Sequence, residues 1–165
     1  MRRSIIIAIL SSLLAICNIS AQEQPIASQQ KANAQSNFYV ADLGDLMGAM
    51  QLRHFKLWFA GRQKYWDLAN YEVKEIRKSF DAAAKFYPTF QNVALGKLIS
   101  GTSEPALAEI DKPIMAKDSK AFSPSFDGLT GECNSCRHAT GVGFIAIRIP
   151  TSSPFSNQSF SPAPE

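Results

Sequence analysis

The sequence has few of the residues that proteins commonly use to bind metals or to hydrolyse substrates. It contains two histidines and three cysteines among 165 residues. A zinc site needs four ligands, and no second C-x-x-C pair is present to complete one. There is no G-x-S-x-G motif, and no βαβ pattern surrounds the cysteines. These absences argue against structural zinc, against α/β-hydrolase chemistry and against a thioredoxin-like redox site.

An excess of charge of one sign is also missing. The sequence has 17 Lys and Arg residues and 14 Asp and Glu residues, which gives a net charge of +3. No dense cluster of basic residues is present, so the sequence gives no case for nucleic-acid binding. The hydrophobic content of 45% and the charged content of 19% are those of a chain with a packed core. The length favours one domain.

The longest apolar stretch, residues 5–16, is short for a helix that spans a membrane. It follows Arg2 and Arg3 and precedes the small residue Ala21. This order is typical of a secretory signal peptide over residues 1–21. Cleavage after Ala21 would send the chain to the periplasm or outside the cell, with no transmembrane span left.

Lipidation at Cys17 is the alternative, and Ile16 argues against it because a small residue normally precedes a lipidated cysteine. With cleavage, both remaining cysteines lie in one motif in an oxidising compartment. They could form haem thioethers, a local disulfide or part of a metal site.

The mature chain is expected to be all-α, a four-helix-bundle-like domain with an extended C-terminal tail. Residues 22–37 are rich in Gln, Ala and Ser and are predicted to be a flexible linker. The helical domain should cover residues 38–140, and an apolar and then Pro- and Ser-rich tail, residues 141–165, should pack on it. Apolar periodicity predicts helices over about 42–60 and 68–87 and a short helix near 93–98. It also predicts a helix that is capped by Ser103 and divided or kinked at Pro113, and a last helix from Ser123 or somewhat earlier. One core should contain Leu57, Trp58, Ile76, Phe80, Phe126 and Leu129.

Two features of the first predicted helix bear on its end and on function. Gly61 is expected to stop it. His54 lies on its apolar stripe. The simpler interpretation of His54 is a core histidine bonded to a carbonyl, and the functional one is a haem ligand or a donor to a haem propionate.

The last predicted helix carries the chemistry. Its apolar stripe places Cys133 and Cys136 on one face with Phe126 and Leu129. The run C-N-S-C-R-H at positions 133–138 is close to C-x-x-C-H, the attachment motif of a c-type haem. An arginine stands where the histidine of that motif belongs, and the histidine follows one residue later.

This run resembles small secreted bacterial cytochrome-c-like proteins, and so do L-R-H-F-K-L-W-F-A-G at 52–61, L-A-N-Y-E at 68–72 and the segments 141–150 and 154–160. The resemblance covers most of the mature chain. It implies haem c attached to Cys133 and Cys136, with His138 and His54 near the iron. It also implies a one-electron carrier rather than an enzyme, which works with redox partner proteins that the sequence does not identify.

Because the histidine of the motif is displaced by one residue, the main question is which side chain would ligate the iron. On a regular helix, position 137 faces inward with Cys133, whereas His138 points away. Arg137 cannot ligate iron, because guanidinium has no lone pair to give. We predict His138 as the proximal ligand, because it is tethered near Cys136 and would turn inward if the helix loosened there, before Gly141.

Two alternatives remain open. His54, or a methionine such as Met47 or Met50, could ligate the iron from the first helix. Otherwise haem is absent, and the chain is a haem-free binding or structural module on a cytochrome-like scaffold.

Overall fold

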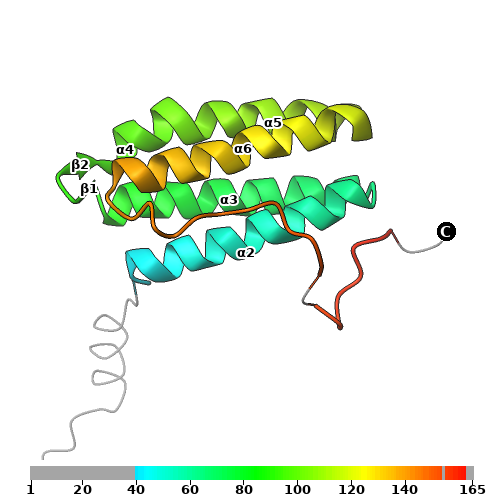
Figure 1. The fold of residues 1–165 in the computed structure, drawn as a ribbon, viewed down its shortest axis with the longest axis horizontal. Helices are drawn as coiled ribbons and strands as arrows, with labels where there is room; N and C mark the ends of the chain where they lie inside the picture. Colours follow the sequence, from blue (N-terminus) through cyan, green and yellow to red (C-terminus); the bar gives the residue numbers. More distant parts are fainter. Residues whose placement is uncertain (1–39, 154, 163–165) are drawn as a thin grey trace, which may run out of the picture. The chain divides into compact units, whose positions relative to one another are not determined.

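The structure is a computed structural model that describes residues 40–153 and 155–162 (Figure 1). The expected signal peptide over residues 1–21, the expected linker over residues 22–37 and Cys17 lie outside the described residues. Within the described part of the chain, no helix is long and apolar enough to cross a membrane.

Four long helices account for most of the described chain, and the prediction of an all-α domain is confirmed. They contact one another in a closed order, because α2 packs on α3, α3 on α5, α5 on α6 and α6 on α2. Figure 1 shows them running side by side along their lengths. Their bounds are Leu43–Arg62 for α2, Trp66–Phe86 for α3, Glu104–Ala116 for α5 and Ser119–Ala139 for α6.

A short hairpin and two short helical turns connect α3 to α5. Gln91 and Asn92 both have positive φ angles, of 50° and 64°, which is the backbone of a tight two-residue hairpin. The short helix expected near 93–98 begins only at Leu95, because the two residues before it pair with the first strand. The elements are β1 (Thr89–Phe90), β2 (Val93–Ala94), α4 (Leu95–Leu98) and the π-helical turn η1 (Ile99–Ser103).

The predicted core is confirmed. Phe126 and Leu57 are fully buried between the helices, and Trp58 is partly buried against the same cluster. The other predicted members, Ile76, Phe80 and Leu129, are buried with them. One apolar face of each long helix therefore points into a shared interior.

Gly61 was expected to end the first helix, and this is wrong. The helix α2 continues through it to Arg62. Gly61 is buried, and a Cβ atom there would overlap the ring of Phe122 on α6. The residue therefore lets α6 approach α2 closely rather than providing a flexible stop.

The helix start expected at Ser103 differs from the structure, whereas the last helix starts somewhat before Ser123, which agrees with the expectation. Ser103 has a helical backbone and makes no capping bond, because η1 continues directly into α5. The helix α6 begins at Ser119, before Ser123, since the Asp118 carboxylate accepts hydrogen bonds from two backbone N–H groups of its first turn at 2.8 and 3.1 Å. Pro113 does not divide α5, which continues to Ala116.

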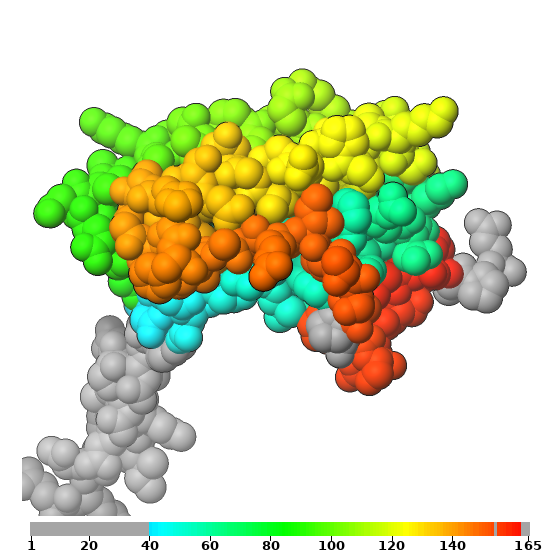
Figure 2. All heavy atoms as spheres, in the orientation of Figure 1, coloured from blue at the N-terminus to red at the C-terminus, as the bar shows by residue number. Residues whose placement is uncertain are grey.

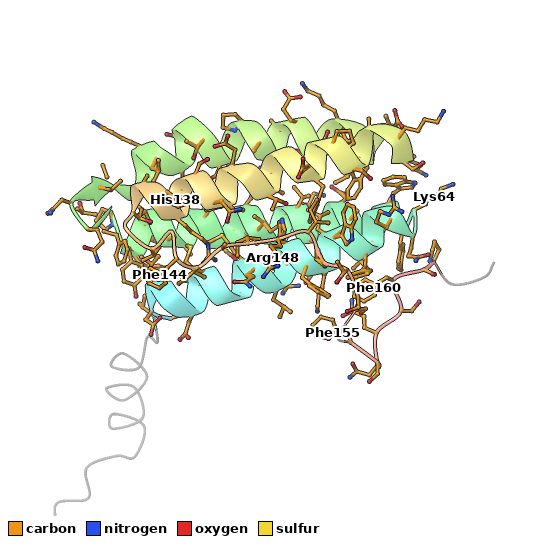
Figure 3. All side chains as sticks on the ribbon, in the orientation of Figure 1. Lys64, His138, Phe144, Arg148, Phe155 and Phe160 are labelled. Atoms are coloured by element: carbon orange, nitrogen blue, oxygen red, sulfur yellow. The ribbon has the colours of Figure 1, made fainter. Side chains whose placement is uncertain are left out.

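The chain after α6 forms no regular element among the described residues and runs back over α6 and α2 (Figures 1 and 2). Ile147, which belongs to this segment, is buried. Further along, the Phe155 ring lies 5.8 Å from that of Phe55, and the Phe160 ring lies 5.6 Å from that of Phe59 (Figure 3). These aromatic contacts fasten the tail to α2.

The close approach at Gly61 can be tested with a matched pair of substitutions in α2. Gly61→Ala should lower the free energy of unfolding by about 1–3 kcal/mol, because the new methyl group overlaps Phe122 in the core. Gly48→Ala should instead raise it by about 0.5–1 kcal/mol, since Gly48 is exposed with open space around it and alanine favours the helix. Urea unfolding measures both values. Equal shifts in the same direction would contradict the packing of α2 against α6.

Candidate functional site

The two thiols lie one turn apart near the end of α6. Cys133 and Cys136 are free and half-buried, and both line one cavity between α2, α3 and α6. The sequence stripe predicted this shared face. Neither thiol is bridged to the other, so both sulfurs remain available for chemistry.

The cavity at the thiols has a volume of about 50 Å³ and adjoins a larger one of about 270 Å³ toward the hairpin end of the helices. We call the two together the thiol groove. Most of its lining is apolar. The residues common to both cavities are Met47, Gln51, Phe80, Cys136 and Arg137.

His54 lies in the same cavity as both thiols. Its Nε2 is 2.9 Å from the hydroxyl of Thr130, and its ring lies 4.3 Å from that of Phe126. Burial, together with the nearby positive charge of Arg137, lowers the pKa of His54 to about 4. The imidazole is therefore neutral at neutral pH. It bonds to a side-chain hydroxyl rather than to the carbonyl that the simpler interpretation expected.

Arg137 occupies the motif position that a haem-ligating histidine would hold. It lines both cavities of the thiol groove, as the geometry of a regular helix predicts. Its guanidinium donates to the backbone oxygen of Ile145 at 3.4 Å and to Oε1 of Gln51 at 3.5 Å. The groove thus has a cationic donor at its edge, but no iron ligand at that position.

His138 lies elsewhere. It is exposed at the end of α6, lines neither cavity, and its ring lies so close to Gly143 that a Cβ atom there would overlap it (Figure 3). The expected loosening of the helix after Cys136 is wrong, because α6 continues to Ala139. Both the backbone N–H and the hydroxyl of Thr140 bond to the Cys136 carbonyl, at 3.1 and 2.9 Å, and they hold this last turn in place.

The apolar surroundings keep both sulfurs protonated. Burial raises the pKa of Cys133 to about 11 and also raises the pKa of Cys136, although Arg137 acts in the opposite direction on both. Thiolates are the form that attacks disulfides and binds zinc. Among the described residues, no group of three or more His, Cys, Asp or Glu side chains could hold a metal ion. The site therefore favours neutral sulfur chemistry.

Asn134 joins the tail to α6, and sequence reasoning did not identify it. Its side chain accepts a hydrogen bond from the Ile147 N–H at 2.7 Å and donates one to the Ile147 carbonyl at 3.0 Å. The Ile147 side chain lines the thiol groove. The side-chain amide of Asn134, which lies between the two cysteines in sequence, therefore holds the tail over them. Its paired hydrogen bonds resemble those that a neighbouring β-strand would make.

Comparison of the chain with protein-family models, with curated proteins and with solved structures finds no match. The chemistry of the site is therefore the basis for its function. An apolar groove with two protonated thiols, a neutral imidazole and a guanidinium at its edge suits an apolar ligand that carries an acidic group.

The role of Asn134 can be tested by hydrogen exchange. Asn134→Ala should speed exchange of the Ile147 amide about 10-fold, because the lost pair of bonds is worth about 1–1.5 kcal/mol. The control is Ser135→Ala, since that exposed hydroxyl bonds only within α6, to the Gly131 carbonyl. Equal exchange rates in both variants would contradict the role of Asn134 in holding the tail.

The burial of His54 should make stability depend on pH. The folded chain binds the His54 proton less readily than the unfolded chain, so stability should fall as pH falls from about 6.5 to about 4. The loss attributable to this group should approach about 3 kcal/mol. Chemical unfolding of the ligand-free protein at several pH values measures it, with His54→Gln as the variant and His138→Gln as the control. If His138→Gln removes this pH dependence and His54→Gln does not, the placement of His54 is wrong.

Proposed function

We propose that the protein binds haem covalently in the thiol groove and carries single electrons in the periplasm. The observation that carries the proposal is that both thiols open into one apolar groove that also contains a neutral imidazole. The resemblance to small secreted bacterial cytochrome-c-like proteins supports it. When bound, the haem iron would supply reversible one-electron exchange.

The thiols would hold the group through thioethers. Each S–H would add across a vinyl group of the porphyrin, so that sulfur would bond to one vinyl carbon and the hydrogen would go to the other. The product is an uncharged sulfur, which matches a site where burial disfavours thiolate at both Cys133 and Cys136.

The edge of the groove suits the acidic part of such a group. Arg137 and Gln51 line both cavities and lie within 3.5 Å of each other. A guanidinium binds carboxylates well, so Arg137 would pair with a haem propionate in place of the Ile145 carbonyl. This gives the arginine a function at the position that the motif reserves for histidine.

The groove must widen to take a porphyrin. Its two cavities, of about 50 and 270 Å³, are at the small end of cofactor sites, which run from about 300 to 1,000 Å³. The tail over the groove is joined to α6 through the Asn134 amide and the guanidinium of Arg137. Haem attachment would therefore come before the tail packs down in its final position.

A second function is favoured by the position of Arg137. Because no histidine stands beside Cys136, the chain could instead be a haem-free module that binds an apolar acid in the same groove. The groove and its guanidinium would then serve the ligand directly, and the thiols would remain unmodified.

The two functions give different absorption spectra. Protein matured with a c-type haem attachment machinery should show a Soret band that survives acid–acetone extraction. The double variant Cys133→Ser and Cys136→Ser should lose that band while remaining folded, because serine cannot form the thioethers. If the original protein shows no such band under conditions that load a control cytochrome c, the haem proposal fails and the haem-free module replaces it.

A further inference from the structure

The hydrogen bonds around His54 determine which ring nitrogen has a free lone pair. The Thr130 hydroxyl donates its one proton to the Phe126 carbonyl at 2.8 Å. Its oxygen must therefore accept from His54 Nε2, at 2.9 Å. In the neutral ring, Nε2 carries the hydrogen and Nδ1 carries the lone pair.

The described residues leave the lone pair of Nδ1 unused. His54 is only 4% exposed, and its ring lines the cavity that contains both thiols. Nδ1 makes no hydrogen bond to the described residues. No fully enclosed side-chain nitrogen or oxygen in the described part of the chain lacks a partner, so Nδ1 keeps some accessible surface, and the space that the His54 ring lines is the cavity of the thiols.

The contacts of His54 with Thr130 and Phe126 fix its imidazole in the way that is usual for metal-binding histidines. A histidine that ligates a metal nearly always donates its other ring N–H to a fixed acceptor, which sets the tautomer and the ring orientation. Thr130 is that acceptor here, and the Phe126 ring supports the imidazole at 4.3 Å with an interplanar angle of 32°. The ligand would therefore be preorganised before any cofactor is bound.

We infer that His54, through Nδ1, is the iron ligand that this chain supplies to a haem in the thiol groove, and that Thr130 is its positioning residue. This inference rests on the proposed function. His138, the ligand that the sequence predicts, lies exposed outside both cavities on a regular helix. Met47 lines both cavities, and its thioether would be a further sulfur near the bound group.

The decisive experiment is cavity rescue in protein that carries covalent haem. His54→Gly should retain the attached haem, shown by its mass, but should lose the absorption spectrum of imidazole-ligated iron. Added free imidazole should restore that spectrum, because it fills the space left by the side chain. His138→Gly should keep the original spectrum without added imidazole.

This experiment measures haem attachment and iron ligation separately, so that either can fail without the other. Covalent haem with an unchanged spectrum in His54→Gly, or loss of the spectrum in His138→Gly, would overturn the inference while the proposed function stands. Absence of covalent haem in the original protein would overturn both.

A second pair of measurements covers the case in which His54→Gly does not fold. Thr130→Val keeps the shape of the side chain and removes the acceptor of Nε2–H, so the haem-loaded variant should show a weakened imidazole-ligated spectrum. In the haem-free protein, nitrogen NMR should find His54 protonated at Nε2. A ring protonated at Nδ1, or an unchanged spectrum in Thr130→Val, would contradict the inference.

Discussion

The packing of Phe126 on α6 against α2 is the contact on which the rest of the structure depends. Its ring lies 4.9 Å from that of Trp58 in the core and 4.3 Å from that of His54 in the thiol groove. Its carbonyl accepts the Thr130 hydroxyl, which in turn fixes the His54 tautomer. One residue of α6 therefore contacts both the hydrophobic core and the histidine of the site.

The thiol groove brings several chemically distinct groups together in one apolar space. A neutral imidazole, two thiols held in the protonated form and an apolar cavity lie beneath a tail that Asn134 and Arg137 join to α6. Filling such a cavity with side chains would stabilise the fold, because empty apolar volume forfeits packing contacts. A flat apolar cofactor with acidic groups would restore these contacts, while the guanidinium of Arg137 meets its charge.

Periodicity was sufficient to predict the fold class and most of the core. The amphipathic pattern located α3 to within two residues at its start and one at its end, and the stripe on α6 placed Cys133 and Cys136 on one face. Helical geometry also predicted the inward position of Arg137 and the outward one of His138. These features follow from neighbours on one helix, which a sequence pattern records.

The remaining features depend on partners that are distant in sequence. Gly61 lies within its helix, where the Phe122 ring occupies the space that a Cβ atom would need, and no local signal shows this. Thr130 contacts His54, which lies 76 residues earlier in the sequence, and Asn134 bonds to a tail residue that lies 13 positions later. The expectation that α6 loosens after Cys136 was wrong, because the Thr140 hydroxyl bonds to the Cys136 carbonyl and closes the last turn. A single sequence carries no record of such contacts.

A crystal structure of the protein, purified from cells that attach c-type haem to a control cytochrome, tests the central claim most directly. The account predicts a porphyrin inside the thiol groove, joined to Cys133 and Cys136, with the imidazole of His54 directed at the iron and Arg137 directed at a propionate. A closed groove with unmodified or disulfide-bridged sulfurs, in protein from those same cells, would contradict it.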